Sequence, residues 1–219
     1  MDRIQLYVSV PIAGFRVVRS REYWDTYPCP PPSTVYGMLL SLVGETDRFV
    51  YKGTEIAISL LSKPSRSCVL RNRWRMKNRK LGFGQVENAC PGFQEFLSDV
   101  RLSVWVRKGK DEKSVSLCEK LASAINCPSS VSRFGGLSLG ESTHLVNEIR
   151  FWRNNDPTEG RLLLKDDCGN LSLPIWPDYK TTYDTCWGQF RLSDFEKLDF
   201  RDNTSLQGGI DPWIKIEKC

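Results

Sequence analysis

Apolar and polar residues alternate along three stretches of the chain, and each stretch predicts a β-strand with one buried face. The stretches cover residues 3–10, 55–61 and 100–107. Side chains two positions apart share a face of an extended strand, so the apolar positions of each stretch can line a common core. These positions are Ile4, Leu6, Val8 and Val10; Ile56, Ile58 and Leu60; and Val100, Leu102, Val104 and Val106. A fourth strand is expected at residues 145–152.

Two other stretches place apolar residues three and four positions apart, which is the spacing of an amphipathic helix. The first covers residues 35–43 and ends at Gly44; the second covers residues 115–125, with Asp111 as its expected N-cap and Val115 in its apolar stripe. The order of elements is therefore strand, helix, strand, strand, helix, strand. This order predicts an α+β fold of the ferredoxin-like type, the arrangement that RNA-recognition motifs also use.

A turn-forming segment, Asn154 to Pro157, marks the expected end of this first domain. We predict a ferredoxin-like domain at residues 1–155 and a small β-rich region at 156–219 packed on it, with short strands near 161–164, 171–176 and 187–192. Tyr7 and Trp105 would lie on the sheet face away from the helices. We expect the C-terminal region to cover them, rather than RNA bases to stack on them.

Between Glu55 and Glu87 the sequence contains no acidic residue, and cations recur there at every second position. Such cations share one face of a strand and repel one another unless a polyanion neutralises them. Trp74 and Met76 would lie on the opposite face, where they could pack against the body or wedge against a base. A solvated edge strand that resists aggregation is the alternative interpretation. The cations of the alternating run are Arg71, Arg73, Arg75, Lys77 and Arg79, and Lys63, Arg66 and Lys80 lie near them.

Glycines at 82 and 84 predict that this segment turns back as a hairpin, at about residues 63–90, inserted between the second and third core strands. The whole chain carries a net charge of only +5, so its positive charge is concentrated in this hairpin. Local basicity favours a binding site for nucleic acid over general attraction to polyanions.

Neither metal nor cofactor chemistry is indicated by the sequence. The eight cysteines include no C-x-x-C pair, and the single histidine, His144, has no cysteine at a ligand spacing. We find no Walker motif, nucleophile elbow or paired carboxylates, and therefore predict no catalytic residues. The N-terminal sequence lacks the basic and long apolar regions of a secretory signal peptide, and no apolar run is long enough to span a membrane. We expect a cytoplasmic protein with reduced cysteines.

Several segments taken together resemble the Cas-five family of CRISPR surveillance complexes. They are the first strand, Gly14-Phe15-Arg16, the proline-rich run at 27–39 that opens the first helix with a P-P-x-T-x-x-G-x-L-like pattern, and the Leu139-Gly140-Glu141-Ser142 loop. The resemblance spans roughly residues 1–155. It implies a non-catalytic subunit of a type I Cascade complex that binds and caps the 5′ handle of the guide RNA (crRNA).

The resemblance further implies that the hairpin is a thumb over the junction of handle and spacer. Its cations would contact phosphates, and Trp74 or Met76 could displace a base. Guide–target pairing would read the target DNA, so the protein meets DNA only through the complex. Its other partners would be the backbone and large subunits. Further expected RNA contacts are Arg16 and Arg19 in the loop after the first strand, the amides at Gly135 and Gly136, and His144.

Two alternatives stay open. Some relatives in the resembled family are metal-independent endoribonucleases that use a tyrosine, a lysine and a histidine on precursor RNA. Here His144 has no adjacent lysine to complete that pattern, and a lone histidine at a strand start is more often structural or phosphate-contacting. The second alternative is an unrelated RNA-recognition module that binds single strands as a monomer.

Overall fold

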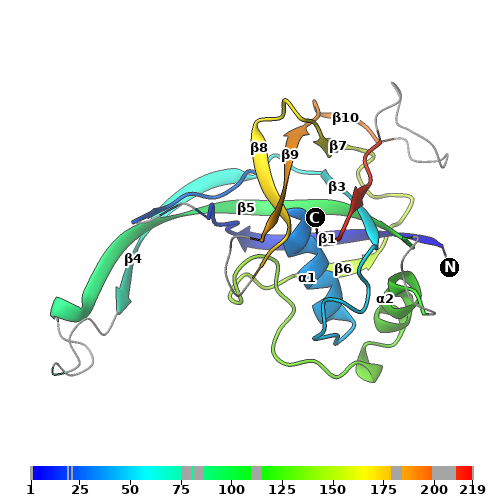
Figure 1. Ribbon diagram of the computed structural model, residues 1–219, viewed down its shortest axis with the longest axis horizontal. Helices are drawn as coiled ribbons and strands as arrows, with labels where there is room; N and C mark the ends of the chain where they lie inside the picture. Colours follow the sequence, from blue (N-terminus) through cyan, green and yellow to red (C-terminus); the bar gives the residue numbers. More distant parts are fainter. Residues whose placement is uncertain are drawn as a thin grey trace.

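The computed structural model describes residues 2–18, 20, 22–74, 80, 86–109, 115–178, 184–198 and 211–218, with the backbone alone at 73, 74 and 87. It is a mixed α/β structure with one large, mainly antiparallel sheet and two α-helices (Figure 1). The helices are α1 (Pro32–Leu42) and α2 (Leu117–Asn126). The strands are β1 (Arg3–Ala13), β2 (Tyr23–Trp24), β3 (Glu55–Leu60), β4 (Ser65–Trp74), β5 (Ala89–Arg107), β6 (Glu148–Phe151), β7 (Glu159–Lys165), β8 (Leu171–Trp176), β9 (Cys186–Leu192), β10 (Glu196–Lys197) and β11 (Ile214–Lys215).

The main path of the sheet runs in the order β6-β1-β5-β3-β7-β9-β8. β5 lies between β1 and β3, antiparallel to β1 through pairs such as Leu6 with Val104 and antiparallel to β3 through pairs such as Ile58 with Val104. The three strands predicted from alternation are therefore confirmed as neighbours in one sheet. The predicted fourth strand is present but shorter: β6 covers Glu148–Phe151 and pairs with β1.

The helices cover one face of this sheet, and the apolar positions predicted for the core lie beneath them. Leu6, Val8, Val100 and Leu102 have no exposed surface, and all of them belong to one apolar cluster with residues of α1 and α2. Burial on this scale supplies most of the stability of such a domain, at about 25 cal/mol for each Å² of apolar surface removed from water.

The opposite face of the sheet is covered by the C-terminal strands, as the sequence predicted for Trp105. Trp105 is 2% exposed and packs with Ala57, Leu162 and Leu164. Tyr7 is also buried, and the guanidinium of Arg150 lies 4.3 Å from its ring centroid. Neither aromatic side chain offers a face on which a base could stack.

Residues 156–219 are joined to the core by hydrogen bonds as well as by packing. β7 pairs with the second half of β3 and β11 with the first half, so the sheet continues from the core into this region. Trp176, at the end of β8, packs against Tyr36 of α1, with ring centroids 6.2 Å apart. The domain boundary near residue 155 stays a prediction.

Three local expectations were wrong. The N-cap of α2 is Ser116, whose hydroxyl accepts a hydrogen bond from the Glu119 N–H, and Asp111 lies outside the described residues. The helix therefore begins after Val115, which is 44% exposed instead of lying in the apolar stripe. Cys186 is disulfide-bonded, although reduced cysteines were expected. The expectation failed because the spacing of cysteines along the chain does not show which thiols the fold brings together. The cysteines described as free are Cys29, Cys68, Cys90, Cys118, Cys127 and Cys168.

Candidate nucleic-acid interface

A two-stranded arm projects from the body of the molecule, as Figure 1 shows. It consists of β4 and of residues 89–98 of β5, paired antiparallel from Ser65–Ser98 to Trp74–Ala89. The sequence placed the hairpin at about 63–90 and the third core strand separately at 100–107. The structure joins them, because β5 is one strand of 19 residues that runs from the arm into the centre of the sheet.

The two faces of the arm carry different side chains. Arg66, Cys68 and Leu70 are opposite Leu97, Glu95 and Phe93 in the register, and alternation puts all six on one face. Arg71 belongs to the other face, with Gln94 and Phe96. Arg66 and Arg71, with side chains 51% and 43% exposed, therefore present their charges on opposite faces of the arm.

Glu95 anchors the first of these faces to the loop that follows β1. Its carboxylate accepts hydrogen bonds from the Tyr23 hydroxyl (3.0 Å), the Thr26 N–H (3.1 Å) and the Arg66 guanidinium (3.0 Å). The Glu95 side chain is 10% exposed, so these donors replace most of the water that the carboxylate would bind. Hydrogen bonds to Cys68 and then to Glu95 raise the pKa of Tyr23, which keeps its hydroxyl protonated as a donor.

Glu141 contacts the other face of the arm, which carries Arg71 and Gln94. Its Oε2 lies 3.3 Å from Arg71 Nη1, and its Oε1 accepts a hydrogen bond from Gln94 Nε2 at 2.7 Å. Arg71 also donates to the Gln94 side-chain carbonyl. The expectation that the arm's cations lack compensating carboxylates was wrong for Arg66 and Arg71. Their partners, Glu95 and Glu141, come from the returning strand and from a distant loop, beyond the acid-free window of the sequence.

His144 supports this second contact from within the body. It is 5% exposed, and its Nδ1 accepts hydrogen bonds from the N–H groups of Gly14 (3.2 Å) and Glu141 (3.0 Å). These bonds require an unprotonated Nδ1. Burial lowers the pKa of His144 below its ordinary value, although the Glu141 charge acts in the opposite direction. The structure thus gives this histidine a structural role in fixing the Leu139–Ser142 loop.

The close approach of this loop to the body requires glycine. Gly140 has φ +104°, and a Cβ added there would lie 2.8 Å from the Gly14 carbonyl oxygen. Gly135 has φ +77° and open space around it, whereas a Cβ at Gly136 would lie 2.8 Å from Leu145. Phe134, immediately before this glycine pair, is fully exposed.

Arg16 lies in the loop after β1, at the base of the arm. Its guanidinium is 4.1 Å from the Trp24 ring centroid, and its Nη2 donates to the Ser20 carbonyl oxygen at 3.0 Å. The predicted contact residues Arg19, Arg75, Met76, Lys77 and Arg79 lie outside the described residues, as do the side chains of Arg73 and Trp74. Lys80 is described and exposed.

An apolar patch on the arm was not predicted. Leu70 is 64% exposed and faces Phe93, which is 51% exposed and lies 6.2 Å from the ring of Tyr23. The sequence does contain Leu70 and Phe93, but nothing in their spacing showed that the fold leaves them exposed on one face of the arm. Aromatic side chains beside cations suit the binding of unpaired bases as well as phosphates.

Within the described ranges, no group of His, Cys, Asp and Glu side chains is placed to hold a metal ion. In the same ranges, neither helix is long and apolar enough to cross a membrane.

Comparison with known proteins gives one curated relative and several similar structures. The chain is 43% identical over 193 residues to "CRISPR-associated protein Cas5" of Myxococcus xanthus (strain DK1622), covering 87% of this chain and 90% of that protein. A chain of a "CRISPR RNA-guided surveillance complex" has a similar fold, with TM-score 0.64, 14% identity, and 90% of both chains covered. A structure described as "Crystal structure of Cas protein" follows with TM-score 0.53, 15% identity and coverage of 89% and 95%. No protein-family model matches the sequence.

Proposed function

Because this chain belongs to the Cas5 family of CRISPR-associated proteins, we propose that it is a non-catalytic, RNA-binding subunit of a type I CRISPR surveillance complex. In this role it binds and caps the 5′ handle of the crRNA and supports RNA-guided recognition of target DNA. The observation that carries the proposal is the two-stranded arm with exposed cations, in a chain of this family. The arm is the proposed thumb at the junction of handle and spacer.

The proposed RNA surface combines the described cations of the arm with residues at its base. Arg66 and Arg71 contact phosphates from opposite faces of the arm, and Arg16 contacts the handle where the arm meets the body. The remaining proposed contacts, which rest on the sequence, are Arg19, Arg73, Trp74, Arg75, Met76, Lys77, Arg79, Lys80, Gly135 and Gly136.

The carboxylates beside these cations do not prevent RNA binding. An exposed ion pair contributes about 0–1 kcal/mol to stability, so a phosphate can displace Glu141 from Arg71 at small cost. Release of counterions from the RNA backbone then favours the complex. Arg66 differs because its partner Glu95 is held by two further donors, so it is expected to keep that bond while its exposed half meets RNA.

The fold is proposed to correspond to the ferredoxin-like arrangement. β1, α1, β3, β5, α2 and β6 follow one another in the expected order, and their strands lie side by side as β6-β1-β5-β3. The arm would then be an insertion between the second and third core strands.

The burial of His144 supports a non-catalytic role over the endoribonuclease alternative. A general acid or base must reach the 2′-hydroxyl region of the RNA, whereas His144 is 5% exposed and its Nδ1 is bound by two backbone amides. We propose that a separate enzyme matures the guide, that this subunit needs no cofactor, and that it works in the cytoplasm. Its protein partners are the backbone and large subunits of the complex.

Co-expression with the neighbouring genes tests the proposal. The tagged chain is purified and its bound RNA is sequenced. We expect one class of guide RNA with a constant, repeat-derived 5′ end. Heterogeneous RNA would contradict the proposal and favour a general RNA-binding module. Cleavage of repeat RNA by the purified chain, abolished in His144→Ala, would support the endoribonuclease instead.

A further inference from the structure

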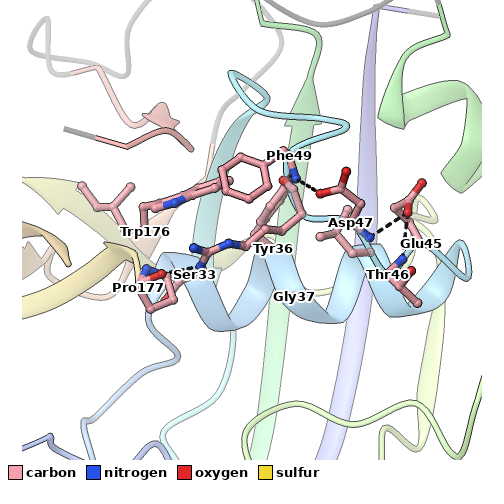
Figure 2. A pocket seen from close by; sticks show the side chains of 12 residues that line it. Ser33, Tyr36, Gly37, Glu45, Thr46, Asp47, Phe49, Trp176 and Pro177 are labelled. Carbon is pink, nitrogen blue, oxygen red and sulfur yellow. Dashed lines mark hydrogen bonds between the residues drawn. The ribbon is translucent and has the colours of Figure 1, made fainter. Parts of the chain in front are cut away.

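A hollow of about 430 Å³ lies between α1, the loop after it and the end of β8, and none of its lining residues is among those assigned to RNA. Figure 2 shows Glu45 and Asp47 toward one end of this hollow and Trp176 and Pro177 toward the other, with Gly37 of α1 between them. We call it the α1 groove. The proposed RNA-binding function leaves it unused.

One wall of the groove is aromatic, and hydrogen bonds of Arg48 connect its parts. Phe49 and Trp176 have ring centroids 5.3 Å apart, and the Arg48 guanidinium lies 4.6 Å from the Trp176 ring. Arg48 also donates to the Pro177 carbonyl oxygen, and its own carbonyl accepts from the Tyr36 hydroxyl at 2.8 Å. Phe49 nevertheless remains 56% exposed, so much of its side-chain surface is open to an outside group.

The other end of the groove carries two carboxylates held in place by backbone amides. Glu45 Oε1 accepts from the N–H groups of Thr46 and Asp47, both at 2.8 Å, and Asp47 Oδ1 accepts from the Phe49 N–H at 2.9 Å. Each carboxylate accepts these hydrogen bonds through one of its two oxygens. The bonds fix the position of each carboxylate but do not neutralise its negative charge.

Gly37 supplies the third feature, an open notch in the helix surface. A Cβ added at Gly37 would meet no atom within 4 Å, and its neighbours Tyr36 and Met38 are buried while Gly37 is exposed. A glycine inside a helix costs about 1 kcal/mol relative to alanine. No contact among the described residues requires glycine here, so the notch is open to an atom group from outside.

We propose that the α1 groove binds an arginine or lysine side chain of a partner protein. Its aliphatic stem would lie in the Gly37 notch against Phe49, and its charged end would reach Glu45 and Asp47. The Arg48 guanidinium already lies over the Phe49 and Trp176 rings, at 5.3 Å and 4.6 Å, so the incoming charge is expected at the carboxylates and only its aliphatic stem at Phe49. RNA is disfavoured, because its phosphates would be repelled by the two carboxylates.

The choice of partner proteins rests on the proposed function, so the probes are the purified backbone and large subunits encoded beside this chain. Gly37→Leu fills the notch, and Glu45→Gln with Asp47→Asn removes both charges while keeping the carbonyl acceptors for the backbone amides. Ser123→Leu, on the exposed face of α2, is the matched control for an added surface leucine.

We expect Gly37→Leu to weaken capture of one subunit about tenfold or more, with Tm equal to or above that of the wild type. The charge-neutral pair should weaken the same capture and reduce its dependence on salt, and Ser123→Leu should change neither. RNA affinity should be unaltered in all variants.

Unchanged capture by a folded Gly37→Leu variant would overturn the proposal. If Gly37→Leu weakens capture but the Glu45→Gln, Asp47→Asn double variant does not, the group in the groove is apolar, and the proposed cationic side chain is overturned. Loss of RNA affinity would assign the groove to nucleic acid. A wild-type protein that captures neither subunit would overturn the proposed function, and this choice of partner with it.

Discussion

Replacing Glu95 by alanine should loosen the base of the arm and destabilise the whole protein. The Thr26 N–H is buried, and without the carboxylate it has no acceptor there, which costs about 1–3 kcal/mol. Loss of the Arg66 ion pair adds at most about 1 kcal/mol, because that guanidinium is half exposed. A total of about 3 kcal/mol in a chain of this length corresponds to a Tm lower by roughly 9 °C.

The assay is thermal unfolding at neutral pH, together with amide hydrogen exchange at Thr26. Glu95→Gln keeps a carbonyl acceptor and should lose less than half as much stability, whereas Glu159→Ala, at an exposed carboxylate of β7, should behave as wild type. If Glu95→Ala unfolds within about 2 °C of wild type and Thr26 exchanges at the same rate, the anchoring role of Glu95 is refuted.

Three further predictions concern the second face of the arm and its support. Arg71→Ala should reduce the slope of log affinity for repeat RNA against log salt by about 0.7, while Arg71→Lys keeps it; equal slopes in fluorescence titrations would remove Arg71 from the RNA surface. Gly140→Ala should cost about 1–3 kcal/mol in chemical denaturation, because φ is +104° and the new Cβ meets the Gly14 carbonyl, and Gly135→Ala should cost less because its surroundings are open. Burial lowers the pKa of His144 in the folded protein, so as the pH falls this histidine is protonated first in the unfolded chain. The contribution of His144 to the free energy of unfolding should therefore be complete above about pH 6.5 and decrease below it. In a pH series of Tm measurements, His144→Gln should lack that decrease.

The sequence predicted those elements whose apolar spacing is regular. β1, β3 and the core half of β5 alternate cleanly. Of the stripe predicted for α2, Cys118 and Leu121 are buried, whereas the buried Leu117 and Ala124 were not predicted. The burial of Trp105 beneath the C-terminal strands was also predictable, since a large aromatic residue on the second face of a sheet needs cover.

The candidate site was predicted less completely, because its key contacts join residues far apart in the chain. Glu141 lies 70 positions from Arg71, and a scan for acidic residues near the cations could not reveal it. Glu95 was missed for a similar reason, since its role depends on the pairing of β4 with β5. The start of α2 was misplaced because Asp111 and Ser116 are both good N-caps and only the structure distinguishes them.

The continuity of β5 restricts how the arm can change in length during evolution. One strand carries the arm at 89–98 and the core at 100–107, and Asp99, with φ +62°, separates the two parts. Adding or deleting a single residue between Glu95 and Asp99 would turn Glu95 away from Thr26 and Gln94 away from Glu141, and adding two would carry both side chains past their partners. A change of length on the tip side of Gln94 leaves both anchors in place. Natural variants of this arm are therefore expected to differ in length beyond Gln94, and to keep the spacing from Gln94 to Asp99.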